Sequence, residues 1–125
     1  MKYFYIVLAS LLVSIFGAPS IADAADAKSC ISFAELERYG TKRNSMTNSC
    51  NTEVHVVWCI HVGGTKFDCG VGGKYYQQQN VLKPGEVYDN VVTLPAGHSF
   101  HYAACSGGYG SVIRNDPASS AVTCK

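Results

Sequence analysis

The sequence has few charged residues, no marked excess of either sign, and no long apolar run beyond its N-terminus. Charged residues make up 15% of the 125 residues, and the formal net charge is +1. A nucleic-acid-binding domain usually has a basic stripe and a high net charge. Here the only close group of basic residues is Lys42 and Arg43. We therefore expect no nucleic-acid partner, and no membrane insertion by the mature chain.

Motifs of common catalytic and nucleotide sites are also missing. No serine stands in a G-x-S-x-G elbow, and the six cysteines leave no odd thiol. Residues 70–74 have the glycines of a phosphate loop. A Walker motif, however, needs Gly where Asp68 stands, Ser or Thr where Tyr75 stands, and a helix afterwards. The sequence therefore predicts neither a nucleotide site nor a cysteine nucleophile.

The four histidines do not form a metal-binding pattern. His55 and His61 share one face of a predicted strand, but they lie about 20 Å apart at strand rise. A zinc site needs three or four ligands around one ion, and oxidised cysteines supply none. We expect no metal and no cofactor.

The N-terminal residues are typical of an export signal. Lys2 precedes an apolar run, Tyr3–Phe16, that is too short to cross a bilayer. Ala22 and Ala24 satisfy the small-residue rule of signal peptidase. We predict that residues 1–24 are a signal peptide and that the protein is secreted or periplasmic.

A second cleavage position is available nearby. Ala25 and Ala27 form another small-residue pair, which permits cleavage before Lys28. Cys30 lacks the preceding pattern of a lipoprotein, so we expect no lipid anchor. The mature part, residues 25–125, has the length of a single domain.

One stretch alternates clearly between apolar and polar residues. Its even positions are all apolar: Val54, Val56, Trp58, Ile60 and Val62. A period of two, rich in β-branched side chains, predicts a strand with one face in a core and one polar face. Gly63 and Gly64 then predict a hairpin turn into a second short strand that ends near Cys69.

Turn-forming residues separate further short strands along the chain. We expect them at residues 29–33, 41–47 (an edge strand), 74–82, 87–94, 98–105 and 111–114. Residues 34–38 could form one helical turn, but no amphipathic helix follows. Seven to eight short strands predict an all-β fold, a small disulfide-stabilised antiparallel β-sandwich or barrel.

A hairpin is predicted around residues 95–97. Pro-Ala-Gly is typical of a three-residue loop, which would pair the strands at 87–94 and 98–105. This register places the large apolar side chains on one face. On the other face it makes Asp89 and His101 diagonal neighbours.

Six cysteines in an exported chain predict three disulfides. Chain proximity favours the pairs Cys30–Cys50, Cys59–Cys69 and Cys105–Cys124. A two-residue turn at 63–64 conflicts with the middle pair, because it leaves Cys59 and Cys69 on opposite faces. Either a bulge shifts the register, or Cys59 pairs elsewhere, for example with Cys105. We predict the local pairing.

Two carboxylate–histidine pairs are candidates for acid–base chemistry. Asp89 could orient His101, and Glu53 shares a strand face with His55. Such a pair is half of a hydrolase or ribonuclease site. The pairs also occur by chance on polar sheet faces, so solvated histidines are the simpler interpretation.

Tyrosines beside amides are the stronger functional signal. Rings stack on a ligand while amides form hydrogen bonds, a mixture that suits sugar or protein recognition. The alternation predicts Tyr75 with Gln77 on one face and Tyr76 with Gln78 on the other. The competing interpretation is that one tyrosine packs in the core. The candidate binding residues are Tyr75, Tyr76, Gln77, Gln78, Gln79 and Tyr109.

The combined motif pattern, from Cys30 to Cys105, resembles that of small exported bacterial proteins with six cysteines. The motifs are N-x-C, W-C, C-G-x-G-G, L-x-P-G and A-C, at residues 48–50, 58–59, 69–73, 82–85 and 104–105. The resemblance implies an exported β domain. It carries no catalytic residue that can be transferred to this chain.

Three functional hypotheses follow. We favour a secreted or periplasmic binding module that recognises a protein or a glycan, in the manner of an inhibitor or effector-like protein. The first alternative is a small secreted hydrolase or nuclease that uses one of the carboxylate–histidine pairs. The second alternative is a structural envelope protein without a ligand site.

Overall fold

The computed structural model describes residues 25–38, 41–91, 93–94 and 98–125. The predicted signal peptide, residues 1–24, and the predicted loop at 95–97 lie outside the described residues. No described helix is long and apolar enough to cross a membrane.

One three-stranded sheet contains β1 (Ile31–Arg38), β2 (Thr41–Asn48) and β5 (Val87–Val91), in the order β1-β2-β5. The prediction of an edge strand at 41–47 is therefore wrong, because β2 is the middle strand. The helical turn considered at 34–38 is also wrong. β1 pairs with β2 along its whole length, and this ladder satisfies backbone groups that one isolated helical turn would leave open.

The second sheet contains β4 (Gln78–Leu82), β3 (Val54–Ile60) and β6 (Phe100–Ser106), in the order β4-β3-β6. Short antiparallel strands β7 (Val112–Ile113) and β8 (Thr123–Cys124) form a third pair.

Two 3-10 turns, η1 (Lys28–Cys30) and η2 (Val71–Gly73), complete the assigned elements. In the described residues the domain is all-β, with eight antiparallel strands in three small sheets, so the predicted fold class is confirmed.

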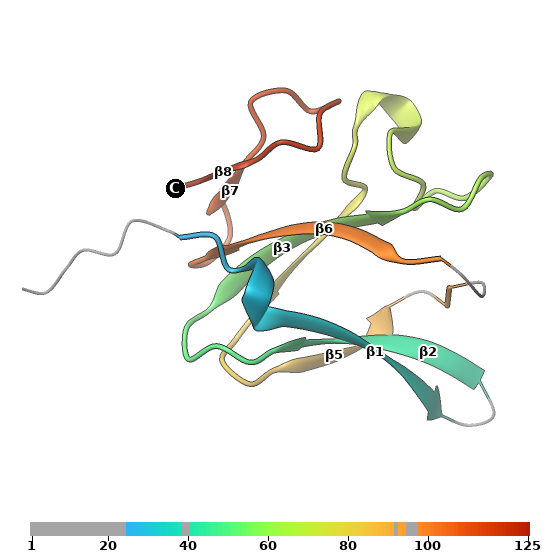
Figure 1. Cartoon of the computed structure of the whole chain (residues 1–125), viewed down its shortest axis with the longest axis horizontal. Helices are drawn as coiled ribbons and strands as arrows, with labels where there is room; N and C mark the ends of the chain where they lie inside the picture. Colours follow the sequence, from blue (N-terminus) through green and yellow to red (C-terminus); the bar gives the residue numbers. More distant parts are fainter. Residues whose placement is uncertain (1–24, 39–40, 92, 95–97) are drawn as a thin grey trace, which may run out of the picture.

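The two three-stranded sheets lie one above the other and enclose the main core (Figure 1). Buried side chains from both sheets fill it: Ile31, Met46, Val54, Val56, Trp58, Ile60, Leu82, Val91 and Ala104. The four from β3 are its even positions, so the apolar face predicted from the alternation is the core face. Burial of such side chains is the main stabilising term in a domain of this size.

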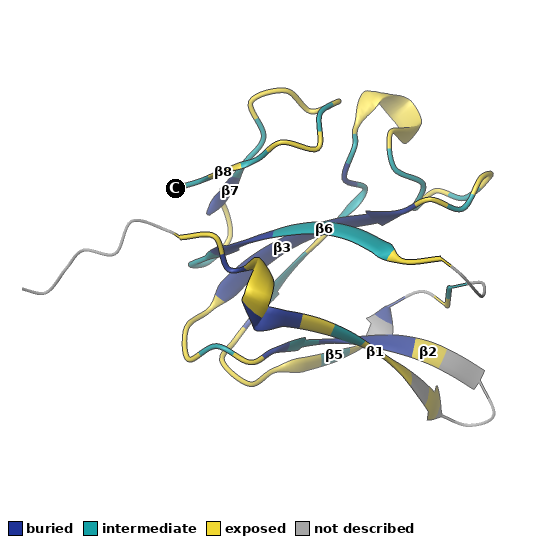
Figure 2. Ribbon diagram, viewed as in Figure 1, coloured by how far each residue is buried: buried dark blue, intermediate teal, exposed yellow. Residues whose placement is uncertain are grey.

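The opposite face of β3 is also covered. All seven residues of β3 are buried, and a second core lies on this side: Val57, Cys59, Tyr76, Cys105 and Val112. The predicted polar, solvent-facing side is therefore wrong. The C-terminal segment with β7 and β8 lies over this face (Figure 2), and the Cys105–Cys124 disulfide ties it there.

The predicted hairpin between 87–94 and 98–105 does not form. β5 pairs with β2 and β6 pairs with β3, so the two strands belong to different sheets. Crossing between the sheets lets both strands face the same core, where Tyr88, Leu94, Phe100 and Tyr102 pack. The predicted core-facing positions of Leu94, Phe100 and Tyr102 are confirmed, while Val92, predicted on the same face, lies outside the described residues. The predicted strand partners are wrong, because a shared core does not require a shared sheet.

The chain after β3 explains the disulfide conflict. Ile60 forms an isolated parallel bridge with Asp68. Its N–H donates to the Phe67 carbonyl at 2.9 Å, and Cys69 N–H donates to the Ile60 carbonyl at 2.9 Å. The predicted second strand of a hairpin is thus a returning loop, and its geometry lets Cys59 reach Cys69.

The structure contains the three local disulfides that the sequence favours: Cys30–Cys50, Cys59–Cys69 and Cys105–Cys124. They indicate an oxidising, extracytoplasmic environment.

Candidate functional site

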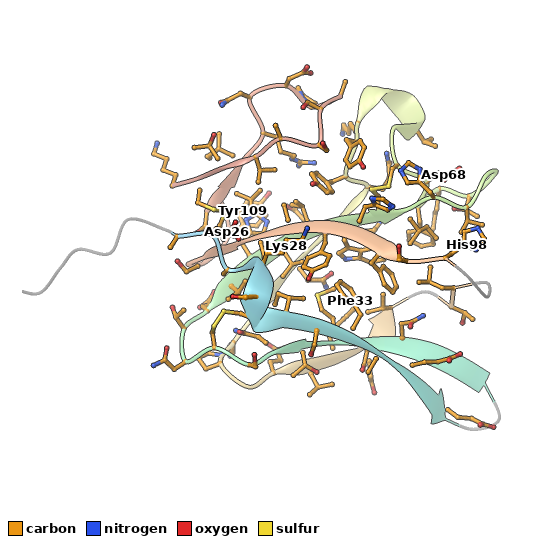
Figure 3. All side chains as sticks on the ribbon, in the orientation of Figure 1. Asp26, Lys28, Phe33, Asp68, His98 and Tyr109 are labelled. Carbon is orange, nitrogen blue, oxygen red and sulfur yellow. A yellow bond between two sulfur atoms is a disulfide. The ribbon has the colours of Figure 1, made fainter. Side chains whose placement is uncertain are left out.

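The predicted binding residues separate into different places. Tyr109 and Gln79 lie together beside His55, near the start of β3. Tyr75 lies beyond the other end of β3, where its ring is near that of His61. Figure 3 labels Tyr109 below the C-terminal segment and Asp68 toward the opposite end of the sheet. The structure therefore does not bring all six candidate binding residues together.

Tyr109 stands above a buried histidine. Residue Tyr109 is 78% exposed, while His55 beneath its ring is 2% exposed. The two rings stack with centroids 5.5 Å apart and an interplanar angle of 29°. Tyr109 is thus an aromatic side chain that faces solvent on one side and is supported on the other.

A chain of hydrogen bonds connects this buried histidine to the surface. Val112 N–H donates to His55 Nδ1 at 3.2 Å. Because a backbone N–H can only donate, Nδ1 must accept, and the proton of the neutral ring lies on Nε2. Nε2 then donates to Gln79 Oε1 at 3.1 Å, and Gln79 Nε2 donates to the Tyr109 hydroxyl at 3.4 Å.

Electrostatics favour the same neutral form. Burial lowers the pKa of His55, and the positive charge of Arg114 lowers it further, although the hydrogen bond to Gln79 acts in the opposite direction. A protonated ring would also point Nδ1–H at the Val112 N–H. His55 is therefore a neutral structural group that orients Gln79 and Tyr109.

The glycine loop that carries Tyr109 has a defined geometry. Gly107 has φ = +114°, and a Cβ there would lie 2.4 Å from Ser111 Oγ. Ser111 Oγ donates to the Gly108 carbonyl at 2.7 Å. Gly107 N–H donates to the Glu53 carbonyl at 2.7 Å. We call Tyr109, Gln79 and Glu53, with His55 beneath them, the Tyr109 surface.

The candidate acid–base pairs are not assembled as expected. β5 and β6 are not paired, so the register that made Asp89 and His101 neighbours is absent. In the other pair, both ring nitrogens of His55 already have partners. A general base needs a nitrogen within reach of the substrate proton, and His55 does not offer one.

His101 instead lies against His61. The His61 and His101 rings are nearly perpendicular, with centroids 4.4 Å apart. The centroid of the Tyr75 ring lies 6.3 Å from that of His61. Burial lowers the pKa of His101, and the positive charges of His61 and Lys28 lower it further. The sequence did not predict this histidine pair, because it depends on β6 lying beside β3, with Cys59 opposite His101. Among the described residues, no group of three or more His, Cys, Asp or Glu could hold a metal ion.

The remaining predicted binding residues have structural partners. Tyr76 is 5% exposed, and its hydroxyl donates to the Ser120 carbonyl at 2.8 Å. Gln77 Nε2 donates to the carbonyls of Val71, at 2.9 Å, and Lys74. Gln78 is paired opposite Trp58 in the sheet. Tyr76 therefore follows the core interpretation considered from the sequence, and Gln77 holds the loop at η2.

A cavity of about 470 Å³ lies between the N-terminal segment, β6 and the C-terminal segment. Its lining includes Asp26, Lys28, Tyr76, Tyr102 and Thr123. Lys28 Nζ lies 5.0 Å from the centroid of the Tyr102 ring. The cavity thus combines charges of both signs with aromatic rings, and it is separate from the Tyr109 surface.

No family model, curated protein or solved structure matches this chain. The resemblance to small exported six-cysteine proteins therefore stays a prediction. The functional argument depends on the geometry described above.

Proposed function

We propose that the protein is an exported binding module that recognises a partner protein through the Tyr109 surface. The supporting observation is the exposed Tyr109 ring, stacked on buried His55 and hydrogen-bonded to Gln79. An aromatic side chain that is ordered before binding loses little conformational entropy on contact. Tyrosine is also among the residues that contribute most to binding energy at protein interfaces.

The surroundings of Tyr109 support recognition by contact. Gln79 and Glu53 are both exposed. Gln79 donates to the Tyr109 hydroxyl, and Glu53 lies against Gly108, next to Tyr109 in the chain, so the two supply donors and acceptors around an aromatic anchor. This combination of a central apolar contact and a polar rim is typical of protein interfaces. A hydrolase or nuclease gains no comparable support, because neither carboxylate–histidine pair has the geometry it requires.

The binding experiment first identifies the proteins that contact the native protein in its source cells. Chemical cross-linking in the source cells, followed by mass spectrometry, identifies a partner that is then purified. We expect Tyr109→Ala to weaken the affinity for this partner at least about tenfold, which corresponds to about 1.4 kcal/mol. Val87→Ala is the matched control, because Val87 is 54% exposed on β5, in the other sheet. Equal affinities for wild type and Tyr109→Ala contradict the proposal.

We further propose that the protein is secreted or periplasmic and that the mature chain begins at Ala25. Ala27 N–H donates to the Ala104 carbonyl at 2.9 Å, and Ser106 N–H donates to the Ala25 carbonyl at 2.8 Å. Ala27 is 3% exposed. Cleavage before Lys28 would remove this pairing and a buried side chain. The intact mass of the mature protein tests the proposal, and a mass that corresponds to a chain starting at Lys28 contradicts it.

Glycan recognition is the second candidate, and the cavity beside Lys28 and Tyr102 is the observation that favours it. Sugars bind where aromatic rings lie beside polar groups. A glycan array screened with wild type and Lys28→Ala tests this function. A glycan bound by wild type but not by Lys28→Ala supports the cavity site, and an array without binders contradicts it.

A further inference from the structure

Strand β4 forms one edge of the sheet β4-β3-β6. In the described residues, no other strand pairs with its outer side. An edge strand presents unpaired N–H and C=O groups, which can pair with an added chain.

The direction of these groups follows from the ladder. Trp58 accepts from Gln77 N–H, and Ile60 exchanges hydrogen bonds with the loop at 67–69. The even residues of β3 therefore direct their backbone groups toward β4. Because the register sets Val56 opposite Asn80 and Trp58 opposite Gln78, the even residues of β4 direct theirs toward β3.

The odd residues of β4 must then face outward. These are Gln79 and Val81, each with one N–H and one C=O directed away from the sheet. The next odd residue, Lys83, is already satisfied: its N–H donates to Glu86 Oε2 at 2.7 Å, and its carbonyl accepts from Asn48 Nδ2 at 3.1 Å. The open edge is thus short and is limited to two residues.

The opposite edge of the same sheet, strand β6, pairs with an extended segment of the chain. Residues Ala25–Ala27 lie along the outer side of β6, with a β-bridge between Asp26 and Cys105. Even residues of β6, Ala104 and Ser106, supply its outward groups, which agrees with the alternation derived for β4. One edge is therefore occupied by the chain's own extended segment, and the other has no partner strand within the part of the chain that the structure describes.

Two features make the β4 edge suitable for a partner. Proteins protect exposed edges by short strands, by charged side chains or by proline. β4 is short, but it contains no charged side chain and no proline: its sequence is Gln-Gln-Asn-Val-Leu. In addition, Gln79 is exposed and bonds to the Tyr109 hydroxyl. A strand added at β4 would therefore run beside the Tyr109 ring.

We propose that the β4 edge binds an extended segment of the partner protein as an added strand, with one partner side chain packed on Tyr109. This inference depends on the proposed function, since both use the Tyr109 surface. The backbone groups of Gln79 and Val81 would supply affinity, and the ring would select an apolar or aromatic side chain at one position. The partner's chemistry is thus that of an unpaired strand or flexible segment.

The decisive variant is Val81→Pro. Proline removes the outward N–H of Val81 and leaves the β3-facing groups of Asn80 intact, a position that edge strands tolerate. Val81→Ala is the matched control, because it shortens the side chain but keeps the N–H. Thermal unfolding of each variant verifies that the domain remains folded.

The probe is a phage-displayed library of random linear peptides, selected on the wild-type protein. We expect selected peptides to lose affinity about tenfold or more with Val81→Pro, and much less with Val81→Ala. Tyr109→Ala should weaken the same peptides. Failure to select any peptide, or peptides insensitive to Val81→Pro, overturns the inference.

The two proposals can fail separately. Peptides lost with Tyr109→Ala but retained by Val81→Pro would keep the proposed function and overturn strand addition. A wild-type protein that dimerises, and becomes monomeric with Val81→Pro, would also overturn it, because a second copy would then occupy the edge.

Amide hydrogen exchange provides a measurement that does not depend on a variant's stability. In the free protein, the amides of Gln79 and Val81 should exchange quickly, while that of Asn80 is protected. A selected peptide should protect Gln79 and Val81. If a bound peptide leaves their exchange unchanged, strand addition at β4 is excluded.

Discussion

His55 and His61 lie on the same predicted face of one stretch of chain, yet they have opposite environments. His55 is buried, neutral and hydrogen-bonded at both ring nitrogens. His61, just beyond the end of β3, is exposed and touches only the rings of His101 and Tyr75 among the described aromatic side chains. The difference lies in the C-terminal segment, which contacts His55 through Val112 and is tied down by the Cys105–Cys124 disulfide, whereas His61 lies beyond the end of β3.

The comparison shows how one small domain obtains two surfaces from one strand. Where the C-terminal segment covers β3, the buried His55 ring has hydrogen-bond partners at both nitrogens and packs beneath the Tyr109 ring. Where the cover ends, the polar groups remain at the surface. The ordering of Tyr109 is therefore a consequence of the cover, since Val112 on β7 supplies the bond that fixes the His55 ring.

The largest effect is expected when the C-terminal segment with β7 and β8 is released from β3. Replacing Cys105 and Cys124 together by Ala should lower the free energy of unfolding by about 3 kcal/mol, the chain-entropy value for a loop of this length. The same variant should expose His55, which NMR of the imidazole signals can detect. In the control, Cys30→Ala with Cys50→Ala, stability should fall but the His55 signals should stay unchanged. Unchanged His55 signals in both variants would contradict the role of the cover.

The second effect separates the two histidines directly. His55→Ala should cost about 2 kcal/mol, because it leaves the buried Val112 N–H without an acceptor and opens a cavity. His61→Ala should change stability by no more than about 0.5 kcal/mol, as expected for a surface position. Urea unfolding of both variants measures the difference, and similar losses would show that burial does not distinguish the two sites.

A smaller effect separates the two neighbouring tyrosines. Tyr76→Phe removes a hydrogen bond to the Ser120 carbonyl under the C-terminal segment and should cost about 1 kcal/mol. Tyr75→Phe, at the His61 end, should be close to neutral. The two substitutions delete the same atom, so equal effects would argue against the contact between Tyr76 and the C-terminal segment.

The smallest effect is on pH dependence. Burial lowers the pKa of His55 below its ordinary value of 6.5, so the unfolded chain binds the proton more readily. Stability should therefore be full above about pH 6.5 and should fall as the pH drops below it, until the folded protein is also protonated. His101 acts in the same direction, because its pKa is also lowered. His55→Gln should flatten the profile more than His101→Gln, and the opposite order would contradict the stronger burial of His55.

Structural features that depend on residues close together in the sequence could be predicted from it. The alternation from Val54 to Ile60 predicted the core face of β3, since side chains of a strand alternate whatever its partners are. Spacing along the chain favoured the three disulfides, because short loops close most readily. Turn residues marked most of the strand positions.

Features that depend on contacts between strands far apart in the sequence could not be predicted from it. The hairpin predicted for β5 and β6 had a self-consistent register, but the two strands lie in different sheets. Residues Leu94 and Phe100 face the core in either arrangement, so hydrophobicity could not choose between them. The disagreement over His101 follows from this one error.

The sequence by itself determined an all-β, disulfide-bonded domain, because strand periodicity and cysteine spacing are local properties. Only the tertiary structure decided which polar residues meet: it buried His55 under β7, joined Gln79 to Tyr109, and left the outer side of β4 without a partner strand among the residues that the structure describes. These are long-range contacts, and their free energy depends on which surfaces remain uncovered after the strands have packed.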